Sequence, residues 1–145
     1  MDGNIRIQPG NEIANRPAKI LLVDEEAADL RILRLTLEGQ GFEVYTCTSY
    51  AAGLRCLEAE PIEFVVVSQG SKAFEGRVVL DYAMKMNRGR PVLVVTRCID
   101  MQCYLEAMQL GAIDYLEKPV PPLDLLRFVR AHVARHEVRY HQAEA

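Results

Sequence analysis

Residues 19–26 read KILLVDEE, a short and uninterrupted apolar run that ends at three consecutive acids. An apolar run of this kind is typical of a strand that is buried on both faces of a sheet. The next segment places Leu30, Leu33 and Leu37 at helical spacing, which predicts a helix with one apolar side. The chain therefore begins its folded part with a strand followed by a helix.

The same alternation continues along the rest of the chain. Apolar runs predict further strands at 42–47, 64–67, 92–95 and 113–116, and helical patterns cover 50–58, 77–87, 101–110 and a last segment that opens at the prolines near 122 and runs to 133. Strands that alternate with helices require a parallel sheet joined by right-handed crossovers. We therefore predict a doubly wound α/β domain whose ligand site lies at the carboxyl ends of the strands.

The composition is that of one globular domain. The chain has 145 residues, of which 50% are hydrophobic and 26% charged, so it can bury one core without disulfides or metals. We expect a flexible leader at 1–17, the domain at 18–136 and a tail at 137–145. The net charge of -3 argues against a nucleic-acid partner, because binding to the phosphate backbone depends on clustered Lys and Arg.

The cysteines and the hydropathy pattern indicate a cytoplasmic protein. Cys47, Cys56, Cys98 and Cys103 form no CxxC pair and follow no secretory segment, so we expect reduced thiols without an assigned role. No apolar run approaches the roughly 20 residues that cross a bilayer, so no membrane span is expected.

Polar side chains follow four of the predicted strands. Asp24 and Glu25 follow the first strand, and Ser68, Thr96 and Lys118 follow the third, fourth and fifth. Adjacent acids at the end of a buried strand need a cation nearby, so they indicate either a hard divalent ion or a lysine. The alternative is that they are helix N-terminal acids, which the helix dipole favours.

Four segments in this order resemble the receiver domain of bacterial response regulators. They are ILLVDEE at 20–26, FVVVSQGSKAFEG at 64–76, PVLVVT at 91–96 and GAIDYLEKP at 111–119. The resemblance covers about 18–136 and implies a flavodoxin-like fold with five helices and five strands in the order 2-1-3-4-5. It also implies a role in two-component signalling.

In that family two acids hold magnesium, an aspartate after the third strand accepts a phosphoryl group, and a Thr and a Lys bind the phosphoryl oxygens. The resemblance assigns the acid pair to Asp24 and Glu25, the hydroxyl to Thr96 and the lysine to Lys118. Tyr115 matches the aromatic switch residue, whose ring swings inward on activation.

The acceptor position holds Ser68, since Gly76 follows eight residues later as the family's spacing requires. A serine hydroxyl needs a neighbouring base before it can attack phosphorus, whereas an ionised carboxylate does not. Magnesium would also lose one of its three carboxylates, which leaves Asp24 and Glu25 as the expected anionic ligands. We therefore expect a weak Mg²⁺ site at most and no resident cofactor.

Two cations also depart from the family's pattern. Arg97 follows the hydroxyl residue where a small residue is usual, and Lys72 stands where proline is common. Our hypothesis is that Lys118, assisted by Arg97 or Lys72, neutralises Asp24 and Glu25 without metal or phosphate. The alternative is that Arg97 and Lys72 point into water, as charged loop residues usually do.

The resemblance predicts a protein-interaction module whose action does not depend on phosphorylation, with a signalling protein as its partner. The family's working surface is formed by its fourth helix, fifth strand and fifth helix, where Tyr104 and Met108 are the predicted contact residues. A homodimer through this face is usual in the family.

Two alternatives stay open. One is a switch that is phosphorylated on Ser68 or on another acid, and the other is that the chain is the regulatory fragment of a longer regulator. No enzymatic activity is expected, because a nucleophile with a base and a cofactor loop are both missing.

Overall fold

The structure, a computed structural model, describes residues 16–144 and the side chains of residues 16–133. Five strands and five helices alternate in it: β1 Lys19–Val23, α2 Ala27–Gly39, β2 Glu43–Cys47, α3 Tyr50–Ala59, β3 Phe64–Ser68, α4 Arg77–Met86, β4 Val92–Thr96, α5 Met101–Gln109, β5 Asp114–Glu117 and α6 Pro122–Glu144. The strands are parallel in the order β2-β1-β3-β4-β5. The predicted fold and strand order are confirmed, while most of the predicted leader lies outside the described residues.

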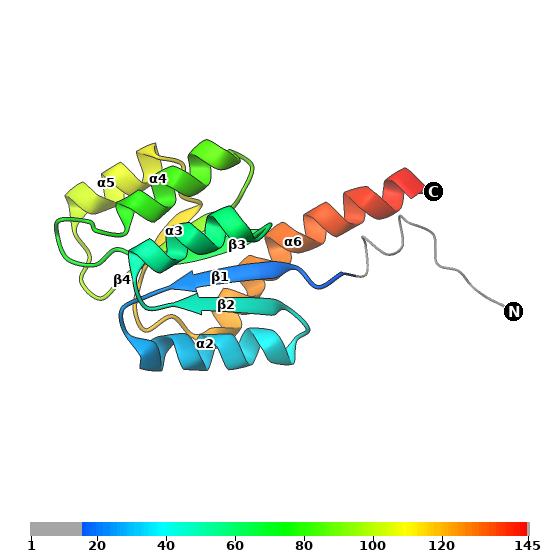
Figure 1. Cartoon of the computed structure of the whole chain (residues 1–145), viewed down its shortest axis with the longest axis horizontal. Helices are drawn as coiled ribbons and strands as arrows, with labels where there is room; N and C mark the ends of the chain where they lie inside the picture. The colour runs from blue at the N-terminus through cyan, green and yellow to red at the C-terminus, as the bar shows by residue number, and fades with distance from the viewer. Residues whose placement is uncertain (1–15, 145) are drawn as a thin grey trace, which may run out of the picture.

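Helices cover both faces of the sheet, with α3, α4 and α5 on one face and α2 and α6 on the other (Figure 1). Successive strand residues point to opposite faces, so Val65 and Val67 join the first layer of core and Phe64 and Val66 the second. All five residues of β3 are buried, as are all five of β4. Burial on both faces explains why these segments read as unbroken apolar runs.

The last helix is longer than predicted. Helix α6 runs to Glu144 instead of ending near Val133, so it includes most of the predicted tail, and its last turns extend beyond the sheet (Figure 1). No Gly or Pro follows Pro122 to end it. Within the described part of the chain, no helix is both long and apolar enough to cross a membrane.

The four cysteines are free thiols. Burial raises the pKa of Cys56 and of Cys103 to about 11, so both thiols are protonated at neutral pH.

Gly76 fixes the course of the loop between β3 and α4. Its N–H donates to the carbonyl of Gln69 at 3.0 Å, which folds the loop back onto the end of β3. A Cβ at this position would lie 2.0 Å from the carbonyl oxygen of Ser68. The backbone of α4 can therefore approach the end of β3 this closely only without a side chain.

We predict that Gly76→Ala lowers the free energy of unfolding by about 2 kcal/mol or more, because backbone atoms must shift to admit the methyl group. Gly39→Ala is the matched control, since a Cβ at Gly39 meets nothing within 4 Å. It lies at the end of α2, where alanine should be neutral or slightly stabilising. Urea unfolding of both variants measures this, and equal stabilities would contradict the close approach.

Candidate functional site

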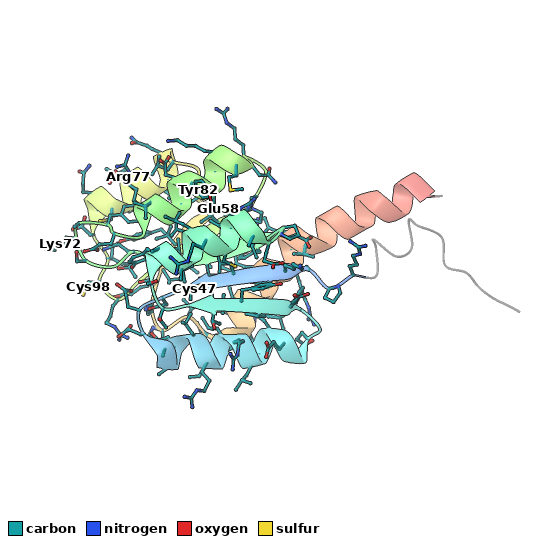
Figure 2. The ribbon with its side chains drawn as sticks, viewed as in Figure 1. Cys47, Glu58, Lys72, Arg77, Tyr82 and Cys98 are labelled. Carbon is teal, nitrogen blue, oxygen red and sulfur yellow. The ribbon has the colours of Figure 1, made fainter. Side chains whose placement is uncertain are left out.

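The four strand ends bring the predicted polar residues to one edge of the sheet. Asp24 and Ser68 are each 5% exposed, and Thr96 is 1% exposed. Lys118 enters from the connection between β5 and α6, and its side chain is 9% exposed. Lys72 and Cys98 mark the same end of the molecule, toward which the strand arrows point (Figure 2).

Lys118 lies at the centre of an ion cluster. Its Nζ lies 2.5 Å from Oδ2 of Asp24, 3.0 Å from Oε1 of Glu26 and 3.3 Å from Oδ2 of Asp29. Burial opposes the charged amine, but the hydrogen bonds to these carboxylates prevail and raise the pKa of Lys118 above 10.5. The lysine is therefore charged and fully engaged by carboxylates of the β1–α2 junction.

Arg97 adds a second cation on the outer side of this cluster. Its guanidinium bonds to Oε1 of Glu26, with Nε at 3.1 Å, and its Nη2 lies 3.3 Å from Oδ2 of Asp29. These bonds from Arg97 and Lys118 lower the pKa of Glu26 to about 2. The hypothesis that Lys118 and Arg97 neutralise acids at this edge is supported by this geometry.

Two parts of that hypothesis need correction. We expected Asp24 and Glu25 to be the anions that face Lys118, but Glu26 and Asp29 take the place of Glu25. The reason is local: Oδ1 of Asp24 accepts the N–H of Glu26 at 3.0 Å, which turns the chain so that Glu25 is exposed. The carboxylate of Glu25 instead lies near Tyr50, whose pKa is raised mainly by burial and further by Glu25.

Lys72 takes no part in the cluster. Its side chain is exposed, and no ion pair joins it to the acids among the described residues. Its backbone carbonyl accepts the thiol of Cys103 at 3.5 Å. For Lys72 the alternative, a loop cation that points into water, is therefore the better description.

A metal ion would have to compete with Lys118. Asp24, Glu26 and Asp29 can each offer one carboxylate oxygen, and these oxygens lie within 4.8 Å of one another. Such a set suits Mg²⁺, which prefers carboxylate oxygens and water. The ammonium of Lys118 already bonds to the same three carboxylates, so bound Mg²⁺ would require the lysine to leave. The residues fit a weak magnesium site that depends on this displacement.

Ser68 and Thr96 do not reach the ion cluster. The hydroxyl of Ser68 accepts the N–H of Gly70 at 3.3 Å, and no bond to Lys118 is present among the described residues. The hydroxyl of Thr96 donates to the carbonyl of Cys98 at 2.8 Å and accepts its N–H at 3.2 Å. Each hydroxyl is thus held by the loop that follows its own strand.

Tyr115 is buried, and its hydroxyl is held by a residue that sequence reasoning missed. The phenol donates to Oε1 of Gln69 and accepts the N–H of Asp100 at 3.1 Å. Gln69 is 2% exposed and also donates from Nε2 to the carbonyl of Ser71 at 3.2 Å. Gln69 is the second polar residue, after Ser68, that follows the apolar run at 64–67, and this was the available signal.

The ring of Tyr115 connects this interior to the surface of α5. Tyr104 packs edge-on against it, with ring centroids 5.6 Å apart and an interplanar angle of 72°. Tyr104 is 38% exposed and Met108 36% exposed, so both predicted contact residues reach the surface. Met101, Leu105 and Ile99 are also exposed on or beside α5.

Comparison with known proteins gives a consistent result. A family model described as the response regulator receiver domain matches residues 20–130. The transcriptional regulatory proteins GlrR of Escherichia coli and KdpE of Mycobacterium tuberculosis are 32% and 31% identical over 74% and 81% of this chain. The chain spans only 24% of GlrR and 51% of KdpE.

Solved structures agree with these relatives. A CheY-like response regulator receiver domain from Methanospirillum hungatei is 28% identical, with a TM-score of 0.78 over 85% of this chain and 98% of that one. A response regulator receiver domain from Clostridium thermocellum is 31% identical, with a TM-score of 0.73 over 83% of this chain and 98% of that one.

We predict that Lys118→Met raises the affinity for Mg²⁺ by about tenfold or more, because three converging carboxylates lose their internal cation. Mg²⁺ should also stabilise this variant against heat far more than it stabilises the wild type. Lys85→Met is the control, since Lys85 is exposed and its ion-pair partner among the residues with described side chains is Asp81 alone. Calorimetric titration measures the affinities, and an unchanged affinity in Lys118→Met would contradict competition between the lysine and the ion.

Acid should remove the contribution of Glu26 to stability. Because the folded-state pKa of Glu26 is lowered from 4.5 to about 2, its stabilisation is complete above pH 4.5 and is lost as the pH falls toward 2. In EDTA, the difference in unfolding free energy between wild type and Glu26→Gln should be constant near neutral pH and shrink below pH 4.5. Glu117→Gln serves as the control, because Glu117 pairs with no cation among the described residues. A difference in unfolding free energy that grows in acid would contradict the stabilising role of Glu26 in the ion cluster.

Proposed function

Because the chain belongs to the response regulator receiver domain family, we propose that it acts in signal transduction as a protein-interaction module whose state does not depend on phosphorylation. The observation that carries this proposal is the engagement of Lys118 by three carboxylates at 2.5–3.3 Å. The family's lysine binds phosphoryl oxygens, whereas this one already holds a full set of anionic partners. We further propose a cytoplasmic location and no enzymatic activity.

The residue at the end of β3 supports the proposal. Ser68 is the last residue of that strand, and its side chain is an uncharged hydroxyl. A hydroxyl needs a positioned base to attack phosphorus. The one histidine whose side chain is described, His132, lies on α6, and its Nδ1 forms a hydrogen bond with the carbonyl of Phe128. The carboxylate that accepts the phosphoryl group in the family therefore has no counterpart at this position.

The position of Tyr115 supports a fixed state. In the family this ring swings inward on activation, and here it is 7% exposed. Its hydroxyl bonds to the buried amide of Gln69, which lies on the chain segment directly after β3. The bond to Gln69 thus holds the ring of Tyr115 inward, a position that the family reaches when it is activated. We infer that the working surface stays in one arrangement until a partner changes it.

The proposed partner surface is formed by α5, β5 and the start of α6. Tyr104 and Met108 contribute exposed side chains, and Tyr104 rests on the ring of Tyr115. Exposed apolar and aromatic groups of this kind suit a protein partner. That partner is a signalling protein or a second copy of this chain, since a homodimer through this face is usual in the family. No direct contact with nucleic acid or membrane is proposed.

A second candidate is a switch in which another acid accepts the phosphoryl group. Glu26 and Asp29 favour it, because both carboxylates lie beside Lys118 and Asp24. Ser68 as the target of a serine kinase belongs to the same class. GlrR and KdpE extend well beyond the matched segment, so the chain can also act as the regulatory part of a longer regulator.

Exposure to acetyl phosphate and Mg²⁺, read by intact mass, separates these functions. We expect no phosphate adduct on the wild-type chain. An adduct that is released by hydroxylamine would identify an acyl phosphate on a carboxylate, whereas an adduct that resists it would be a phosphoester on a hydroxyl, assigned to Ser68 if Ser68→Ala lacks it. Either adduct would overturn the proposal.

Ser68→Asp is the matched gain-of-function variant. It restores a carboxylate at the end of β3, so its affinity for Mg²⁺ should exceed that of the wild type. Ser71→Asp places the same charge on the exposed loop and is the control. Equal magnesium affinities in Ser68→Asp and the wild type would contradict the assignment of Ser68 to the acceptor position.

A further inference from the structure

A pocket of about 370 Å³ lies beside the ion cluster, on the face of the sheet that α2 and α6 cover. Ile32 and Leu33 of α2 form one wall, and residues 119–122 form the opposite wall. Val66 and Val95, from the central strands, line its floor. Its volume falls within the range of about 300–1,000 Å³ that is usual for small-molecule sites.

The packing of α2 explains why the pocket exists. This helix fully buries only Leu30 and Leu37, and Ile32 is 57% exposed. The connection before α6 lies across the pocket from α2, and its backbone is restricted by three prolines, Pro119, Pro121 and Pro122. It leaves the space between itself and α2 unfilled. Val66 and Val95 consequently retain 4% exposure each, whereas Val65 and Val67 on the opposite face have none. The floor of the pocket is the apolar surface of the sheet itself.

One end of the pocket is charged, because Asp24, Asp29, Arg97 and Lys118 also line it. Two acids and two cations thus line the pocket, and Glu26, the third acid of the ion cluster, lies outside this lining and gives the whole cluster a formal charge of -1. Oδ2 of Asp29 bonds to both cations at 3.3 Å, while its Oδ1 accepts no hydrogen bond from any described residue. Asp29 therefore offers an anionic oxygen at the mouth of an apolar pocket.

We propose that this pocket binds a small organic cation, an ammonium group carried on an alkyl or aryl body. The body would lie against Val66, Val95 and Leu33 and remove apolar surface from water. The ammonium would donate to Asp29 and balance the net charge of the cluster. A carboxylate ligand would instead be repelled by Asp24 and Asp29, whose cations are already engaged, and a neutral ligand would leave the net charge of the cluster unbalanced.

This site shares the ion cluster with the proposed function, because Asp24, Asp29, Arg97 and Lys118 line the pocket, and the inference rests in part on that function. The pocket uses the side of the sheet opposite α3, α4 and α5, and it involves neither Ser68 nor Tyr115. Different measurements test the two conclusions: a phosphate adduct would overturn the proposed function, whereas the ligand titration below tests the pocket.

Three ligands of equal length test the proposal: hexylammonium, 1-hexanol and hexanoate, each titrated into the full chain in EDTA and followed by amide NMR. Hexylammonium should shift the amides of Asp29, Leu33 and Val120 and bind about tenfold or more tighter than hexanoate. Equal or tighter binding of hexanoate or hexanol would overturn the assignment of a cation. Shifts confined to other surfaces, or no saturable shift, would overturn the site.

Two pairs of variants locate the interaction. Asp29→Asn should weaken hexylammonium about tenfold without changing hexanol, whereas Glu38→Gln, exposed on the same helix, should change neither. Ile32→Trp should obstruct the mouth and weaken all binding. Leu35→Trp is its control, because Leu35 is 58% exposed, close to the 57% of Ile32, and does not line the pocket. Equal effects within either pair would contradict the proposed site.

Discussion

The contact between the ammonium of Lys118 and the carboxylates of Asp24, Glu26 and Asp29 is the constraint on which the rest of this site depends. Three carboxylates whose oxygens lie within 4.8 Å of one another repel each other, and the ammonium of Lys118 offsets this repulsion. The lysine comes from the end of β5 and the acids from the end of β1 and the start of α2. The cluster therefore joins segments that the sheet order separates by two strands.

The same contact organises what surrounds it. If Lys118 turned toward Ser68, it would lose its bonds to three carboxylates. The hydroxyl of Ser68 is instead bonded to the N–H of Gly70 in the loop after β3. The hydroxyl of Tyr115 donates to Gln69 and accepts the N–H of Asp100, so the polar group of this buried ring has partners within the fold. On the face of the sheet that α2 and α6 cover, Asp24 and Asp29 of this cluster also line the apolar pocket.

The sequence predicted the fold well because burial on both faces leaves a plain signal, namely unbroken apolar runs such as FVVV at 64–67 in β3. The meeting of Asp24 with Lys118 followed from the rule that carboxyl ends of parallel strands share one edge. The choice of Glu26 over Glu25 did not follow, because it depends on the single turn capped by Asp24. Asp29 lies in the first turn of α2, three residues after the N-cap residue Glu26, and this spacing could have indicated that the two acids lie close together. Gln69 was missed because its partner, Tyr115, is 46 residues away.

A crystal of the wild-type chain soaked in Mg²⁺ and beryllofluoride tests the central claim most directly, because beryllofluoride mimics a phosphoryl group. We predict that Lys118 keeps its contacts with Asp24, Glu26 and Asp29, and that no fluoride density forms beside Ser68. An occupied metal site with beryllofluoride near Ser68 and Lys118 turned toward it would contradict the claim.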